Sequence, residues 1–292
     1  MILKIGFLSF WEGGDIEQFK ERAFFSPLNN NGIRYMEVNP YEAECHVVFV
    51  GVFGVPDIVG LKGNPVLISV RTEPRGWFDN NERLCSYHIG FEPDSENSLY
   101  YPLWVPYAND ALLYRSDSIG LDGKTGLCSF MFSNPNCERR NEVFRYLSEN
   151  YKKVDSIGRW MNNVGFIIPR GDFSYPKKYK FNICFENSSS SSDYRYITEK
   201  IICAYAYDSI PVYWGNDCIG EYFDEKSFIN CNGLANEEIL ERVKEIDNND
   251  GLYLEMVNYD AKPLLKKHIL EYGLKFVEFV SRVLFIAKGI VL

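Results

Sequence analysis

Short apolar runs alternate with amphipathic and polar stretches along the first part of the chain. The run His46–Val52 is apolar almost throughout, which is typical of a strand buried on both faces of a parallel sheet. Further strands are predicted at residues 2–10, 33–38, 65–70 and 87–91, and a helix is predicted at 16–25. Strands that alternate with helices predict a parallel α/β domain.

A second series of elements follows residues 109–126, a polar, glycine-containing segment that we interpret as an inter-domain linker. The series comprises predicted strands at 127–132, 154–159 and 227–230 and predicted helices at 138–150 and 236–245. The pattern therefore predicts two domains, residues 1–115 and 116–260, and a C-terminal tail, residues 261–292.

The stretch Lys180–Gly215 predicts one complete βαβ unit, because a strand, a polar loop with five serines, a helix start and a second strand follow one another. In such a unit a ligand binds where the first strand ends and the helix begins. We expect an anionic ligand there. The polar residues at that place are Glu186, Asn187, Asp193, Tyr196, Glu199 and Lys200.

The tail is more basic than the rest of the chain, and residues 274–288 place apolar side chains on one helical stripe. Two interpretations stay open. The helix packs against the body of the protein, or it is a basic amphipathic helix that contacts an anionic membrane surface. The basic residues concerned are Lys262, Lys266, Lys267, Lys275, Arg282 and Lys288.

Charge and motif content exclude several classes of protein. A formal net charge of −9 argues against broad nucleic-acid binding, which needs a basic surface. The three histidines lie far apart in sequence, which argues against a histidine metal site or a Ser-His-Asp triad. P-loop and dinucleotide fingerprints are absent, and so is an Asp-x-Asp triplet. We therefore expect side chains and backbone amides, rather than a metal ion, to hold any phosphate.

The cysteines and the N-terminus favour an intracellular protein. None of the eight cysteines forms a C-x-x-C pair, and several lie in apolar runs, which predicts reduced core thiols. The first residues, MILKIGFLSFW, lack the charged start and cleavage site of a signal peptide. We interpret them as the first strand.

Two cations stand near predicted helix starts. Thr198 is a suitable N-cap, and Lys200 in the first turn opposes the helix dipole. Lys200 is either a solvated surface lysine or one of the groups that bind a diphosphate. Arg140 follows a strand and an Asn-Pro-Asn turn, so it would lie over the same anion if both helix starts meet at one cleft. Taken alone, such an arginine is usually solvated.

Glu73 is the candidate for catalysis, because it follows a buried strand and lies near the carboxyl end of a parallel sheet. The alternative is an ordinary loop salt bridge with Arg71 or Arg75.

The run FENS…DYRYITEKIICAYAYDSIPVYWG resembles the signature of the α-1,3/1,4-fucosyltransferases, glycosyltransferase family 10. The segments 133–144 and 152–165 also resemble bacterial members of that family. The resemblance covers nearly the whole chain and is strongest over 128–230. The chain departs from the family in a longer, serine-rich loop and in a short basic tail without heptad repeats.

The resemblance implies the GT-B fold, in which two Rossmann-like domains face each other. The N-terminal domain would bind the acceptor sugar, near Trp11, Glu12 and Trp77, and the C-terminal domain would bind GDP-fucose. The general base falls on Glu73. The donor-binding residues that we expect are Arg140, Tyr196, Glu199 and Lys200, together with Asn187 at the same strand end.

The reaction implied is an inverting α-1,3-fucosyl transfer from GDP-β-L-fucose to the GlcNAc of a Galβ1-4GlcNAc-type glycan, which gives a Lewis x type product. An α-1,4 or mixed linkage, another nucleotide sugar, and a catalytically inactive glycan-binding module are the alternatives. We expect no required cofactor, with a divalent metal at most stimulating the reaction, and no nucleic-acid partner. The expected location is cytoplasmic, with the tail as the contact to the inner face of the membrane.

Overall fold

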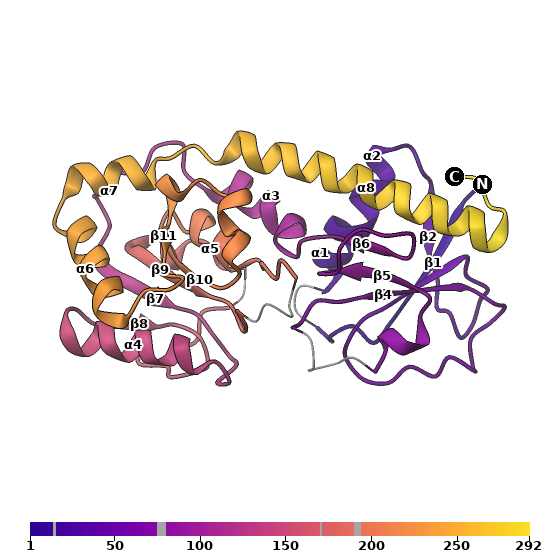
Figure 1. Ribbon diagram of the computed structural model, residues 1–292, viewed down its shortest axis with the longest axis horizontal. Helices are drawn as coiled ribbons and strands as arrows, with labels where there is room; N and C mark the ends of the chain where they lie inside the picture. Colours follow the sequence, from indigo (N-terminus) through magenta and orange to yellow (C-terminus); the bar gives the residue numbers. More distant parts are fainter. Residues whose placement is uncertain (14–15, 75–79, 170, 190–193) are drawn as a thin grey trace. The chain divides into compact units, whose positions relative to one another are not determined.

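The computed structural model describes residues 1–13, 16–74, 80–169, 171–189 and 194–292. The chain forms two compact units, each with its own sheet (Figure 1). The first unit comprises Met1–Pro106, Ser192–Tyr196 and Lys267–Leu292, and the second comprises Tyr107–Ser191 and Ile197–Lys266. Each unit is therefore built from segments that lie far apart in sequence.

The first sheet contains six parallel strands among the described residues, in the order β2-β1-β3-β4-β5-β6. Every residue of β3 is buried, as its continuous apolar run predicts. The five strands predicted here are confirmed with shorter ends, whereas β6 was not predicted. The strands are β1 (Leu3–Leu8), β2 (Tyr35–Glu37), β3 (Val47–Val50), β4 (Val66–Val70), β5 (Tyr87–Gly90) and β6 (Ser98–Tyr100).

The helix predicted at 16–25 is longer than expected. It consists of α1 (Ile16–Lys20), a π-helical segment η1 (Glu21–Phe25) and α2 (Ser26–Asn30), which follow one another without a break. Its Phe24 packs against Phe49 of β3, with ring centroids 4.6 Å apart. This segment therefore covers one face of the first sheet.

The second sheet is also parallel, with the strand order β11-β10-β9-β7-β8 in the described part of the chain. The predicted βαβ unit is confirmed as β9, α5 (Lys200–Ala206) and β10, with Phe185 in register with Trp214. The strands are β7 (Gly126–Phe130), β8 (Val154–Ser156), β9 (Tyr179–Phe185), β10 (Ile210–Trp214) and β11 (Ile229–Asn230).

Helices cover both faces of the second sheet. Alternate residues of β9, such as Phe181 and Ile183, share one hydrophobic core with α4 (Glu138–Asn150), α6 (Asn236–Asp247) and α7 (Asp250–Val257). The residue after Ile183, Cys184, points to the other face, where its Sγ contacts the Lys200 carbonyl of α5 at 3.3 Å. The bounds of α4 agree with the prediction, while α7 was not predicted.

The predicted linker at 109–126 is wrong in its first part, because α3 (Trp104–Tyr114) continues through it. Trp104, Ala108 and Ala111 recur at helical spacing and are all buried. Asn109 and Asp110, which lie between these residues, made the segment read as polar, so the helix was not predicted. Short helical turns complete the fold at η2 (Glu82–Leu84), η3 (Tyr175–Lys178), η4 (Asp217–Glu221) and η5 (Glu225–Ser227).

The predicted tail helix is confirmed as α8 (Lys262–Lys288), and its apolar stripe is buried. Phe276 packs against Phe24 and Phe49 of the first unit. Arg282 donates to the carbonyls of Ser95 and Glu96. The interpretation of α8 as a helix packed on the body is therefore confirmed over this stripe.

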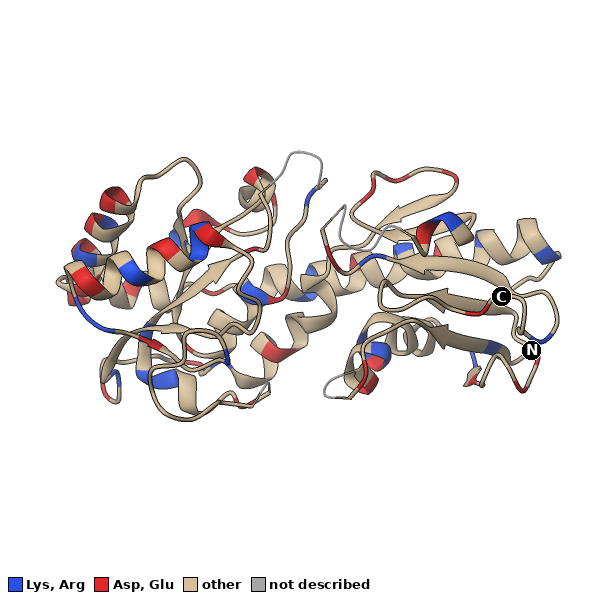
Figure 2. Ribbon diagram, turned by 90° about the horizontal axis from the view of Figure 1, so that it is seen from below, with Lys and Arg blue, Asp and Glu red and all other residues tan. Residues whose placement is uncertain are grey.

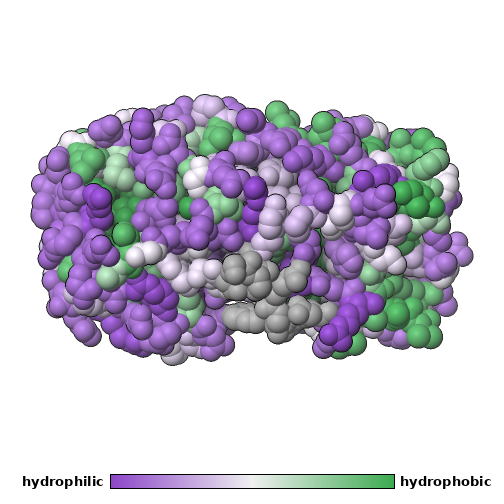
Figure 3. Space-filling model, in the orientation of Figure 1, coloured by the Kyte–Doolittle hydropathy of each residue, from purple (hydrophilic) through white to green (hydrophobic). Residues whose placement is uncertain are grey.

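Some of α8 stays uncovered. Phe285 and Ile286 are 59% and 63% exposed, and hydrophobic surface is visible in Figure 3 at the right-hand end, where Figure 1 draws the first sheet and the end of α8. No helix in the described residues has the length and apolar character needed to cross a bilayer. Acidic and basic residues are interspersed along the ribbon of both units (Figure 2).

Candidate functional site

Arg140 lies in the second unit, in the first turn of α4, and its side chain is completely buried. The guanidinium donates to the Asn134 carbonyl at 2.8 Å, to the Phe185 carbonyl at 3.3 Å and to Asn187 Oδ1 at 3.1 Å. It also lies over the ring of Phe132, 3.9 Å from the centroid. Arg140 therefore joins the start of α4 to the segment that follows β9, and the interpretation of Arg140 as a solvated residue is wrong.

Glu186, which lies between Phe185 and Asn187 directly after β9, faces the start of α5. Its carboxylate accepts hydrogen bonds from the Thr198 backbone N–H and hydroxyl, both at 2.7 Å, and from Lys200 Nζ at 3.1 Å. Glu186 is fully buried, while the Lys200 side chain is 15% exposed. Burial raises the pKa of the Glu186 carboxyl above its ordinary value, although Lys200 and Thr198 oppose this shift.

The expected capping role of Thr198 is wrong. Helix α5 begins at Lys200 with Glu199 as the N-cap residue and without a side-chain cap. The Thr198 hydroxyl donates to Glu186 instead, and it accepts from Lys200 Nζ at 2.8 Å. Glu199 itself is half-buried beside this network. Lys200 is thus held by an ion pair and is not a freely solvated lysine.

Within the second unit the structure brings Arg140, Asn187 and Lys200 to the carboxyl end of β9. Both cations contact the Phe185–Asn187 segment. It binds Arg140 through the Phe185 carbonyl and the Asn187 side chain, and it binds Lys200 through the Glu186 carboxylate. Two cations next to one strand end are suited to bind an anion such as a diphosphate.

Tyr196 belongs to the first unit, although it lies only four positions before Lys200. Its ring is buried and packs edge-on against Phe91 at 4.8 Å. The chain therefore passes from one unit to the other directly before the donor-site candidates Glu199 and Lys200.

Glu73 also belongs to the first unit, where it follows β4 and is half-buried. Its neighbour Arg71 forms an ion pair with Glu82, and Arg71 Nε donates to Glu82 Oε1 at 2.6 Å. One of the two arginines proposed as salt-bridge partners of Glu73 thus has Glu82 as a partner. The other, Arg75, lies outside the described residues, as do Trp77 and Asp193.

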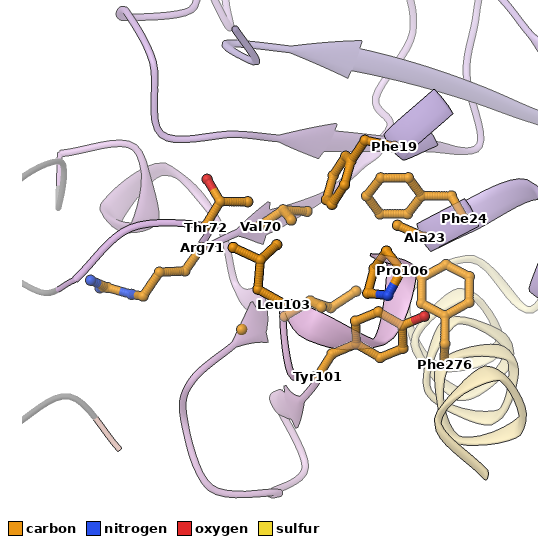
Figure 4. Close-up of a pocket in the computed structure, with 12 residues that line it drawn as sticks. Phe19, Ala23, Phe24, Val70, Arg71, Thr72, Tyr101, Leu103, Pro106 and Phe276 are labelled. Atoms are coloured by element: carbon orange, nitrogen blue, oxygen red, sulfur yellow. The ribbon is translucent and has the colours of Figure 1, made fainter. Parts of the chain in front are cut away.

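A small hollow lies at the carboxyl end of β4, and the guanidinium of Arg71 points away from it (Figure 4). Its walls are mostly apolar, so it is part of the core of the first unit rather than a site for an anion. Trp11, the other aromatic residue expected near the acceptor, packs against Phe19 at 5.0 Å. The hollow is lined by Phe19, Phe24, Val70, Thr72, Tyr101 and Phe276, among others.

Sequence reasoning missed the role of Glu186 as the partner of Lys200. A carboxylate at the end of a strand that is almost completely buried is unusual unless it is paired, and this was the available signal. No group of three or more His, Cys, Asp or Glu side chains in the described ranges is arranged to hold a metal ion.

Comparisons with known proteins identify the family. Residues 121–272, which contain Arg140, Glu186 and Lys200, match the family model described as glycosyltransferase family 10 (fucosyltransferase) C-term. The "Alpha-(1,3)-fucosyltransferase FucT" of Helicobacter pylori is 27% identical over 87% of this chain. The human "4-galactosyl-N-acetylglucosaminide 3-alpha-L-fucosyltransferase 9" is 26% identical over 61% of it.

A solved structure, "Crystal Structure of alpha1,3-Fucosyltransferase with GDP-fucose", matches with a TM-score of 0.69 and 22% identity, over 97% of this chain and 90% of the solved one. This match shows the fold, and the predicted GT-B class is confirmed. The chain spans 59% of the Helicobacter pylori relative and 47% of the human one. Because the family model covers more than half of the chain, the protein is a member of glycosyltransferase family 10, the fucosyltransferases.

Proposed function

We propose that the protein is an inverting α-1,3-fucosyltransferase, which transfers L-fucose from GDP-β-L-fucose to the GlcNAc of a Galβ1-4GlcNAc-type glycan. One observation carries the proposal. The ammonium of Lys200 and the guanidinium of Arg140 both contact the Phe185–Asn187 segment at the carboxyl end of β9, within the residues that match the family. This is the place where a parallel α/β unit binds its ligand.

The donor would bind in the second unit. Lys200 would hold the diphosphate directly, because its side chain is partly exposed. Arg140 is buried beneath the Phe185–Asn187 segment. It would contact the diphosphate directly only if that segment moves; otherwise it would act by holding the Asn187 side chain in place. Glu199, half-buried at the start of α5, would bind the ribose hydroxyls. The ribose role of Tyr196, whose ring is buried in the first unit, stays a prediction.

Glu73 would act as the general base. In a single displacement the acceptor hydroxyl oxygen attacks C1 of fucose, the bond from C1 to the β-phosphate oxygen breaks, and Glu73 takes the hydroxyl proton. The electron pair of the broken bond leaves with GDP. Lys200 and Arg140 would stabilise the negative charge that develops there.

The test is to incubate the purified protein with GDP-fucose and N-acetyllactosamine and to analyse the product by NMR. An α-linked fucose on O3 of GlcNAc supports the proposal. Substitution at O4 in type 1 acceptors supports the α-1,4 or mixed alternative, and turnover only with another donor in a nucleotide-sugar panel supports a different transferase. Glycan binding without any GDP release would identify an inactive binding module and overturn the proposal.

The remaining expectations concern metal dependence and membrane contact, and each has its own measurement. We expect activity to persist in EDTA, with a divalent metal at most stimulating it. We also propose a cytoplasmic protein that contacts the inner face of the membrane through the uncovered residues of α8. Co-sedimentation with anionic vesicles, compared for the wild type and a Phe285→Ser/Ile286→Ser variant, tests this contact, and equal sedimentation of the two proteins contradicts it.

A further inference from the structure

Glu186 combines full burial with a charge, which proteins tolerate only where the charge is paired and hydrogen-bonded. Each of its carboxylate oxygens accepts a hydrogen bond from the segment that leads into α5. Oε1 accepts from the Thr198 backbone, and Oε2 accepts from both the Thr198 hydroxyl and Lys200. The carboxylate therefore fixes the backbone at Thr198 and the end of the Lys200 side chain at once.

The other side of Glu186 is also closed. A Cβ atom added at Gly215 would lie 2.6 Å from Glu186 Cγ and 2.6 Å from the Tyr213 hydroxyl. Such a distance is well inside van der Waals contact, so the Glu186 side chain occupies the space that a larger residue at 215 would need. Glu186 is thus packed between Gly215 and the start of α5.

The consequence for Lys200 is geometric. An ammonium group has three N–H donors, and two of the directions around Nζ are fixed by Glu186 Oε2 at 3.1 Å and Thr198 Oγ1 at 2.8 Å. With two directions fixed, the third is fixed as well. A lysine side chain would otherwise sample many rotamers, and ordering it only when the ligand binds would weaken binding.

We propose that Glu186 is a positioning residue of the donor site, which holds the Lys200 ammonium in its binding orientation and balances its charge before an anionic diphosphate arrives. The inference rests on the proposed function of Lys200 as a diphosphate ligand. Glu186 acts through Lys200 and does not itself touch the donor, because a carboxylate in contact with a diphosphate would repel it.

The test is a double-mutant cycle with GDP as the probe, measured by titration calorimetry on the full chain. The variants are Glu186→Gln, Lys200→Met and the double variant. We expect Glu186→Gln to weaken GDP binding about tenfold in the wild-type background, and to change it less than twofold when Lys200 is already methionine. An equal loss in both backgrounds, or no loss in the wild-type background, overturns the proposal.

The matched control is Asp247→Asn. Asp247 is a buried carboxylate of the same unit that pairs with two lysines, Lys152 and Lys180, at the end of α6. If breaking any buried pair in this unit weakened GDP binding, Asp247→Asn would do so too, and the effect of Glu186→Gln would be merely structural. We expect Asp247→Asn to lower the melting temperature and to leave GDP affinity unchanged.

A milder variant keeps the proposal falsifiable if Glu186→Gln does not fold. Thr198→Val has nearly the same shape, but it lacks the hydroxyl that contacts both Glu186 and Lys200. It should also weaken GDP binding, and normal binding in Thr198→Val would count against the proposal. The outcome also separates this inference from the proposed function. Normal GDP binding by Lys200→Met would overturn both the proposed role of Lys200 as a diphosphate ligand and the positioning role of Glu186. A loss in Lys200→Met together with normal binding in Glu186→Gln would overturn only the role of Glu186.

Discussion

The guanidinium of Arg140 lies over the ring of Phe132, with 3.9 Å between its central carbon and the ring centroid. The stacked guanidinium then has two edges with which to reach carbonyls on both sides, those of Asn134 and Phe185. An ammonium group is a compact donor and cannot span these acceptors. The residue at position 140 is therefore specified by shape as well as by charge.

We predict that Arg140→Lys lowers the free energy of unfolding by about 2 kcal/mol, because buried carbonyls lose their donors. GDP binding should weaken in the same variant. Urea unfolding and calorimetry measure the two effects. The control is Arg145→Lys on the same helix, where the side chain is 45% exposed, and a comparable loss of stability there would contradict the prediction.

Glu73→Gln should reduce kcat by about 10²–10⁴-fold, because glutamine cannot take a proton from the acceptor hydroxyl. GDP affinity should stay within about twofold of the wild type, since the donor contacts lie elsewhere. Steady-state kinetics and GDP titration check this. Glu82→Gln is the control, because Glu82 pairs with Arg71 near the same loop but has no proposed part in the reaction. Near-full turnover by Glu73→Gln would show that another residue is the base.

Gly215→Ala should destabilise the fold by about 1–3 kcal/mol, since the new methyl group would press on Glu186 and Tyr213. Both neighbours are buried and cannot move aside freely. Thermal unfolding gives the difference. Gly120→Ala provides the comparison, because the nearest atom to its added Cβ is 3.9 Å away. Equal melting temperatures of Gly215→Ala and Gly120→Ala would contradict the packing argument.

Leu284→Ala should cost about 2–5 kcal/mol of stability, because Leu284 is fully buried on the apolar stripe of α8. Phe285→Ala, one position later, removes a larger side chain that is 59% exposed, and it should change stability by less than about 0.5 kcal/mol. Denaturant titration of both variants measures the contrast. The reverse order of effects would mean that α8 packs with a different face.

Acidification should separate the effect of Glu186 on folding stability from its effect on GDP binding. Because burial raises its pKa in the folded state, the folded protein takes up this proton at a higher pH than the unfolded chain does. The stability that wild type gains from this proton, relative to Glu186→Gln, is fully present below the unfolded pKa and is lost as pH rises through the folded pKa.

GDP binding should change in the opposite direction, because the protonated carboxyl no longer holds the Lys200 ammonium as an ion pair. The other polar or charged groups near Glu186 are Thr198, Glu199 and Tyr213; burial holds the pKa of Tyr213 well above its ordinary value. Paired unfolding and GDP-binding curves between pH 7 and 4, repeated with Glu199→Gln, isolate the Glu186 contribution. If stability and GDP affinity changed with pH in the same way in the wild type and in Glu186→Gln, the prediction would be contradicted.

The sequence predicted the elements whose signals are local. The bounds of α4 followed from a turn before Glu138 and an amphipathic run to Asn150, and the βαβ unit followed from two apolar strands around one helix start. It failed for α3, where Asn109 and Asp110 made a helix with a buried face resemble a linker. The polar composition of that segment was weighted more heavily than the helical spacing of its apolar residues, so the helix was predicted as a linker.

The site was predictable in its residue types but not in its contacts. Arg140 was recognised as a cation near a helix start, yet its burial depends on Phe185 and Asn187, which lie 45 and 47 positions further along the chain. Lys200 was recognised for the same reason, while its ion pair with Glu186 requires two segments 14 residues apart to meet. Pairings of this kind arise only from tertiary packing, so a propensity pattern does not contain them.

The first unit takes Phe276 of α8 into its core, beside Phe24 and Phe49. On a ribosome the two phenylalanines from the first fifty residues are made long before this partner emerges. The N-terminal part of the first unit is therefore synthesised first but reaches its final packing only after α8 has been made. Until then its apolar surface around Phe24 and Phe49 is uncovered and is a site that chaperones could bind. A stop codon before α8 would leave the N-terminal half unfinished, although every residue of its sheet would be present.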